Sequence, residues 1–101
     1  MKQSIANKMK MVEPLFQSHK IEKVYLFGSA TTDAFSAKSD IDLLISFQKD
    51  LDPLEKGELW WSLHDSLRVF FNREIDLITE GSLQNPYFIE EVNNTKQLIY
   101  G

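Results

Sequence analysis

Residues Tyr25–Phe47 read YLFGSATTDAFSAKSDIDLLISF, and this stretch contains the pattern that decides the fold. It begins with a short run of aromatic and aliphatic residues, which is typical of a buried strand. The run ends at Gly28, where the absence of a Cβ allows a ligand to approach the backbone closely. Ser29 is a favourable N-cap. The sequence therefore predicts a short helix from Ser29, with free N–H groups suited to binding phosphate.

Three aspartates follow on strand-like segments. Asp40 and Asp42 open the second apolar run, and their spacing of two directs both carboxylates to the same face of a strand. Asp76 alternates with apolar residues in a later run, so it can join that face if the two strands are neighbours. Adjacent carboxylates repel one another, and hard divalent cations relieve the repulsion. Three carboxylates beside a phosphate-binding turn predict a site for two metal ions acting on a nucleotide.

Hydrophobic periodicity places further elements around this stretch. We expect helices over 4–18, 54–72 and 86–99, and strands over 22–28, 40–47 and 73–79. Pro14 is expected to kink or shorten the first helix. Trp61 lies off the apolar stripe of the long helix, which predicts an exposed side chain that contacts a partner or a second copy of the chain. The predicted order is αβαβαβα. It describes an α/β fold with a small mixed sheet of about three strands flanked by helices, in one domain over residues 1–101.

Composition restricts the function classes. The net charge is −4 and no basic cluster is present, which disfavours the binding of long nucleic acid. The chain has no cysteine, so disulfides and thiolate metal sites are excluded. No apolar run approaches the length of a membrane span, and the N-terminus lacks the apolar region of a signal peptide. We therefore expect a cytoplasmic protein that does not bind membranes.

The motif resembles that of a known superfamily. Gly28-Ser29, ten intervening residues, Asp40-x-Asp42 and the later Asp76 resemble the pattern of the DNA polymerase β-like nucleotidyltransferases. Within that superfamily, the small size is similar to the minimal nucleotidyltransferases (MNT), which are often paired with HEPN-domain proteins in toxin–antitoxin systems. The resemblance covers almost the whole chain and implies a single-domain nucleotidyltransferase fold.

The resemblance also implies an activity. The chain would be a metal-dependent enzyme, similar to protein adenylyltransferases, that transfers a nucleoside monophosphate, with AMP from ATP favoured. Asp40 and Asp42 would hold two Mg²⁺ ions that bridge the triphosphate, and Asp76 would hold the ion nearer the acceptor hydroxyl and help activate that hydroxyl. Gly28 and Ser29 would bind the outer phosphates. The favoured acceptor is a tyrosine of a HEPN-type partner, which makes this chain the antitoxin, and self-association is a further option.

Two alternatives stay open. A small-molecule nucleotidyltransferase of the antibiotic-modifying kind usually has an additional domain for its acceptor, whereas a non-catalytic antitoxin of the same fold would act by contact alone. Many minimal nucleotidyltransferases continue Gly-Ser with Ala-Arg-Gly, but this chain has ATTD at residues 30–33. The missing arginine favours the contact-only antitoxin, and the intact carboxylates favour the enzyme. Lys38 and Arg73 are the candidates for a replacement positive charge.

Overall fold

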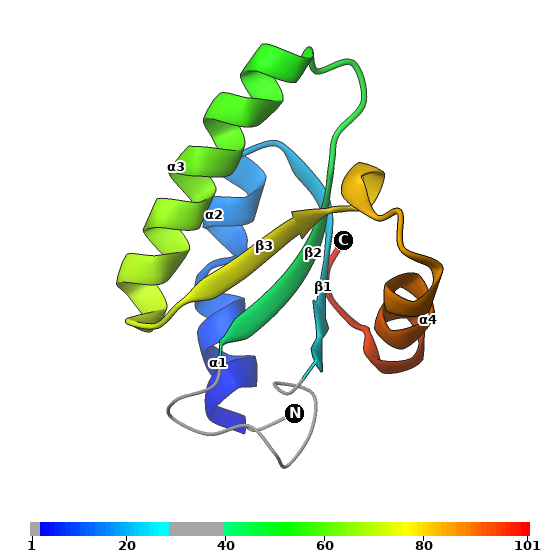
Figure 1. The fold of residues 1–101 in the computed structure, drawn as a ribbon. Helices are drawn as coiled ribbons and strands as arrows, with labels where there is room; N and C mark the ends of the chain where they lie inside the picture. Colours follow the sequence, from blue (N-terminus) through cyan, green and yellow to red (C-terminus); the bar gives the residue numbers. More distant parts are fainter. Residues whose placement is uncertain (1–2, 29–39) are drawn as a thin grey trace.

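The computed structural model describes residues 3–28 and 40–101 (Figure 1). Its helical segments are α1 (Gln3–Met11), α2 (Glu13–Ser18), α3 (Pro53–Phe71), the short 3-10 turn η2 (Glu80–Ser82) and α4 (Pro86–Thr95). Its strands are β1 (Ile21–Phe27), β2 (Ile41–Phe47), β3 (Ile75–Thr79) and β4 (Gln97–Tyr100). Within the described residues the strands form one sheet in the order β3-β2-β1-β4. The predicted α/β class, with helices flanking a small mixed sheet, is confirmed.

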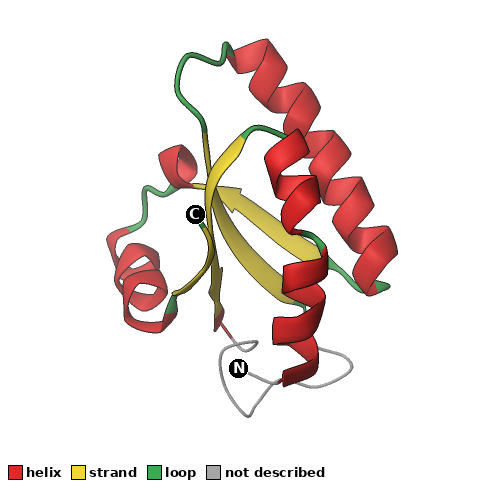
Figure 2. Cartoon of the chain, turned by 180° about the vertical axis from the view of Figure 1, so that it is seen from behind, coloured by secondary structure: helices red, strands yellow, loops and turns green. Residues whose placement is uncertain are grey.

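The two faces of the sheet are covered by different helices, as Figures 1 and 2 show. Strand residues alternate between the faces. Ile41, Leu43 and Ile45 of β2 therefore belong to a core that includes buried residues of α1, α2 and α3. Leu44 points the other way and packs with Phe27 and with Val92 of α4. The odd-numbered residues of β2 thus pack against α1, α2 and α3, while the even-numbered ones face α4.

Local sequence signals set most helix boundaries. The Asp52 carboxylate accepts a hydrogen bond from the Glu55 N–H at 2.9 Å and caps α3, which ends at Asn72 in the left-handed conformation with φ 53°. The helix predicted over residues 4–18 is two helices, because the chain breaks at Val12 and restarts with Pro14 in the first turn of α2. Among the helices of the described residues, none combines the length and the apolar content of a membrane span.

The predicted last helix over 86–99 is wrong in its second half. The α4 helix begins as expected, because the Asn85 side chain accepts a hydrogen bond from the Tyr87 N–H at 2.9 Å, but it ends at Thr95. Residues Gln97–Tyr100 form β4, which pairs antiparallel with the edge of β1. The sheet therefore has four strands where we expected about three, and the order αβαβαβα is corrected to end in a strand. Asn, Asn and Thr at 93–95 are weak helix formers, and the open edge of β1 offers the following residues backbone partners.

Substitution of Gly57 tests whether this position of α3 is open to solvent. Gly57 lies in the interior of the helix without a positive φ, and a Cβ added there would meet no atom within 4 Å. Because interior glycine costs about 0.5–1 kcal/mol relative to alanine, Gly57→Ala should stabilise the protein by that amount. Thermal unfolding by circular dichroism should show a Tm higher by roughly 2–8 °C.

The matched control is Gly28→Ala. Gly28 has φ +74°, and a Cβ there would overlap Oδ2 of Asp42, so the same substitution should lower the Tm. An unchanged or lowered Tm for Gly57→Ala would contradict an open helix position.

Candidate active site

Asp42 and Asp76 lie side by side on two neighbouring parallel strands. They are directly paired in the register of β2 and β3, so both side chains leave the same face of the sheet. Asp40 precedes β2 by one residue and is exposed, as is Asp76, whereas Asp42 is partly buried. Ile41, Leu43 and Ile45 alternate with these carboxylates and lie in the core on the opposite face of the sheet.

The turn after β1 lies against this pair. Phe27 is the register partner of Asp42 on the other side of β2, so Gly28 follows directly beside the carboxylate. Only a residue without a Cβ fits there, because a Cβ on Gly28 would overlap Oδ2 of Asp42. The Gly28 N–H donates to Oγ1 of Thr95 on α4 at 3.5 Å, and that hydroxyl in turn donates to the Glu91 carbonyl at 3.0 Å. The end of α4 therefore contacts the glycine turn.

Negative charge accumulates around Asp42. Its burial, followed by the charges of Asp76, Asp40 and Glu91, raises the pKa of the Asp42 carboxyl to about 6. The charges of the other two predicted aspartates, Asp40 and Asp76, therefore both act on the Asp42 carboxyl. Glu91 is a fourth carboxylate that the sequence reasoning missed. No motif marks Glu91 or Thr95, since their place at the site depends on how α4 packs across the sheet.

The other predicted site residues fall in two groups. Ser29, with the short helix expected from it, the ATTD segment and Lys38 lie outside the described residues. Arg73 lines a surface hollow together with Asp65, Arg68 and Val69 at the end of α3. Asp65 and Arg68 belong to the helix that covers the opposite face of the sheet from the carboxylates.

The chemistry of these side chains fits a hard divalent cation, because carboxylate oxygens are its preferred ligands and three acidic neighbours add to burial in raising the pKa of the Asp42 carboxyl. Within residues 3–28 and 40–101, no three acidic, histidine or cysteine side chains converge closely enough to surround an ion as they stand. Binding an ion would therefore require these carboxylates to rotate toward one another, which the exposed positions of Asp40 and Asp76 permit.

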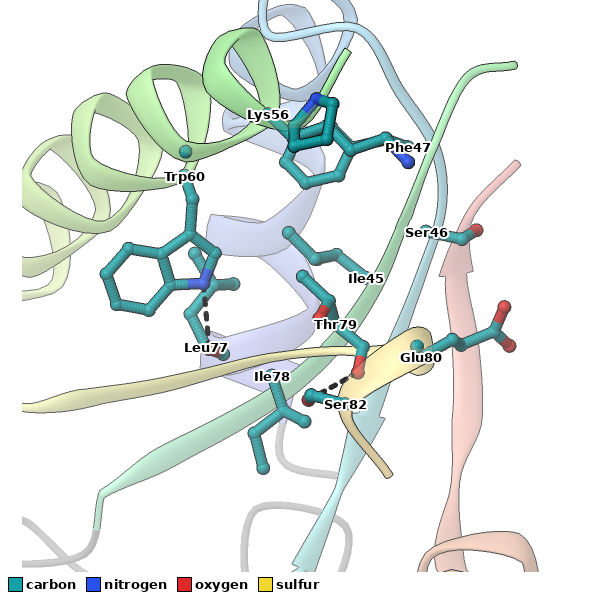
Figure 3. Close-up of a pocket in the computed structure, with 13 residues that line it drawn as sticks. Ile45, Ser46, Phe47, Lys56, Trp60, Leu77, Ile78, Thr79, Glu80 and Ser82 are labelled. Carbon is teal, nitrogen blue, oxygen red and sulfur yellow. Dashed lines mark hydrogen bonds between the residues drawn. The ribbon is translucent and has the colours of Figure 1, made fainter. Parts of the chain in front are cut away.

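A hollow on the described surface lies elsewhere. It occupies about 690 Å³ at the far ends of β2 and β3, between the start of α3 and η2 (Figure 3). Asp76 is three residues upstream of Thr79 on its wall, roughly 10 Å along the strand. None of the predicted site residues lines this hollow. The carboxylates thus lie outside this hollow.

A family model described as "Polymerase beta, Nucleotidyltransferase" matches residues 10–101. The chain belongs to this family. A relative from Methanocaldococcus jannaschii, called a putative protein adenylyltransferase, is 33% identical over 86 residues, which cover 85% of this chain and 82% of the relative. The predicted class of enzyme, a nucleotidyltransferase, is confirmed.

Solved structures share the fold. A chain from a toxin–antitoxin complex with AMP-PNP has a TM-score of 0.70 at 23% identity, over 95% of this chain and 73% of that chain. A chain from a complex of a tri-AMPylated HEPN toxin of Shewanella oneidensis with an MNT antitoxin has a TM-score of 0.59 at 22% identity, over 94% of this chain and 71% of that chain. At these identities the likeness concerns the fold, and the predicted nucleotidyltransferase fold is confirmed.

The raised pKa of Asp42 makes stability depend on pH. The carboxyl has an ordinary pKa of 3.8 when unfolded and about 6 in the folded protein, so between these values the folded state keeps a proton that the unfolded state has lost. The contribution of Asp42 to stability therefore falls as pH rises from about 4 to 6 and stays low above that. In metal-free buffer, Asp42→Asn should have a higher Tm than wild type at pH 7.5, and this advantage should shrink as pH falls toward 4.

The control for net charge is Glu58→Gln, which removes an exposed carboxylate from α3, on the other face of the sheet. It should not reproduce the pH-dependent difference in Tm. A constant difference between wild type and Asp42→Asn from pH 4 to 8 would contradict the electrostatic account of the cluster.

Proposed function

We propose that this chain transfers a nucleoside monophosphate, with AMP from ATP favoured, to a hydroxyl of a HEPN-type partner protein, a tyrosine being the favoured acceptor. The observation that carries the proposal is the direct pairing of Asp42 and Asp76 on adjacent strands beside the Gly28 turn. Family membership gives the type of reaction. The relative called a putative protein adenylyltransferase supports a protein acceptor, and the fold shared with an MNT antitoxin complex supports the choice of partner.

Different carboxylates would act on the two substrates, the nucleotide and the acceptor. Asp40 and Asp42 would hold the ions that bind the triphosphate, while Asp76 would serve the acceptor hydroxyl. Bound Mg²⁺ ions would neutralise phosphate charge and make the acceptor hydroxyl easier to deprotonate. The hydroxyl oxygen would then form a bond to the α-phosphorus as the bond to pyrophosphate breaks. Asp76 would direct the departing proton, and the Gly28 turn with Ser29 would hold the outer phosphates.

A contact-only antitoxin is the second candidate. The ATTD segment at 30–33, in place of the family's arginine-containing stretch, is the observation that favours it. Such a protein would bind its partner without modifying it. The experiments below separate the two, because the enzyme must bind nucleotide through its carboxylates and add AMP.

The first experiment concerns metal and nucleotide. Ligands that bind only the folded state stabilise it, by about 2.7 kcal/mol at a concentration 100 times Kd. Mg²⁺ with ATP should therefore raise the Tm of wild type, and Asp42→Asn should lose the increase. Asp65→Asn, an exposed acid on α3, is the control and should keep it. Equal increases in wild type and Asp42→Asn would show that these acids are not the nucleotide site.

The second experiment separates binding from catalysis. Because Asp76 would serve the acceptor and Asp42 the triphosphate, Asp76→Ala should reduce the transfer rate by 100-fold or more, while ATP affinity changes by less than about threefold. Asp42→Ala should reduce both. Transfer is measured as added AMP by intact mass spectrometry of the partner, and ATP affinity by calorimetry. A wild type that binds its partner tightly but adds no nucleotide would contradict the enzyme and support the contact-only antitoxin.

A further inference from the structure

The hollow between α3 and η2 is lined by one face of the start of α3, by the ends of β2 and β3, and by η2. Its wall on α3 consists of Pro53, Lys56, Gly57 and Trp60, which share one helix face through spacings of three and four. The opposite wall is Thr79 and η2, and Ile45–Phe47 of β2 form the floor (Figure 3). We call this the α3–η2 groove. It is separate from the carboxylates, so the nucleotide chemistry does not explain it.

Two glycines, one on each wall of the groove, leave the backbone there without a covering side chain. A Cβ at Gly57 or at Gly81 would meet nothing within 4 Å, and neither residue has the positive φ that requires glycine. Gly57 in particular weakens the helix that contains it. Since neither backbone conformation nor internal packing requires these glycines, a molecule that approaches the backbone closely from outside accounts for them.

The way β3 is capped restricts what that molecule can be. In this sheet β3 is an edge strand, so half of its backbone groups point away from β2. Trp60 Nε1 donates to the Leu77 carbonyl at 3.0 Å, as Figure 3 shows, and His64 Nε2 contacts the Ile75 carbonyl at 3.1 Å. These bonds occupy carbonyls that an added strand would need. The groove therefore suits inserted side chains rather than strand addition.

The charges at the groove favour a protein over a nucleotide. Lys56 on one wall and Glu80 on the other are exposed, and in the described part of the chain neither forms an ion pair. A polyanion would gain from Lys56 but would be repelled by Glu80. A protein segment with an apolar side chain flanked by residues of both signs would complement the two walls.

The apolar surface continues beyond the groove. Leu54 is 75% exposed and Trp61 is 63% exposed, and they lie two turns apart on α3, next to the groove residues Pro53 and Trp60. Trp61 packs edge-on against Trp60 with ring centroids 4.8 Å apart. We propose that the α3–η2 groove, together with Leu54 and Trp61, docks the partner protein through an inserted apolar side chain flanked by charged residues. The inference rests on the partnership in the proposed function, but not on the transfer chemistry.

The test uses the HEPN-type partner of the proposed function, and its binding to this chain is measured by calorimetry. Gly57→Leu fills the groove while adding a good helix former, so it should weaken binding by about tenfold or more with an unchanged or higher Tm. Gly57→Ala should weaken it less, in proportion to the smaller side chain. Trp61→Ala should also cost about tenfold. Tyr87→Ser removes an 84% exposed aromatic residue from α4, across the sheet, and should change affinity less than twofold.

The outcomes separate the docking surface from the function. Wild-type affinity in both Gly57→Leu and Trp61→Ala would overturn the docking surface, whether or not AMP is transferred. AMP transfer is measured beside binding, and a wild type that binds the partner through the groove without transferring AMP concerns the catalytic proposal alone. If the chain alone forms a dimer and Gly57→Leu dissociates it, the groove docks a second copy of the chain, and the proposed partner is overturned. A weakened ATP affinity in Gly57→Leu would instead assign the groove to nucleotide.

Discussion

The parallel pairing of β2 with β3 is the constraint on which the rest of the site depends. Its register places Asp42 opposite Asp76, a contact that two carboxylates alone would avoid. The register is held because Ile41, Leu43 and Ile45 are buried in the core with residues of α1, α2 and α3. A slip by one residue would turn these side chains out of that core, and each is worth about 1.5–3 kcal/mol when buried. Hydrophobic burial thus imposes the repulsion at the site.

This repulsion suits a protein that handles nucleoside triphosphates. Asp40, Asp42, Asp76 and Glu91 concentrate negative charge at one end of the sheet, and the pKa of Asp42 is raised by its burial and then by the charges of the other three. A triphosphate would be repelled by the same charges unless cations accompanied it. Under the proposed function, the nucleotide would therefore bind together with divalent cations rather than alone. The α4 helix contributes twice, through Glu91 and through the Thr95 hydroxyl that contacts the Gly28 turn.

The opposite end of the sheet has a different character. There the walls of the α3–η2 groove are apolar side chains, two glycines and one charge of each sign. Separating the two regions along β2 and β3 allows a partner to be held without covering the carboxylates. Under the proposed function, this separation would let affinity for the partner and chemistry on the partner be set by different residues.

The sequence by itself determined the elements with strong local signals and the face on which the aspartates lie. A period of two puts Asp40 and Asp42 together, and the caps at Asp52 and Asn85 define the starts of α3 and α4, because these effects act within a few residues. Only the tertiary structure decided that Asp76 lies beside Asp42, that Glu91 and Thr95 reach the site, and that Gln97–Tyr100 form a strand. Each depends on segments far apart in the chain, where burial and the pairing of an open strand edge outweigh local propensity.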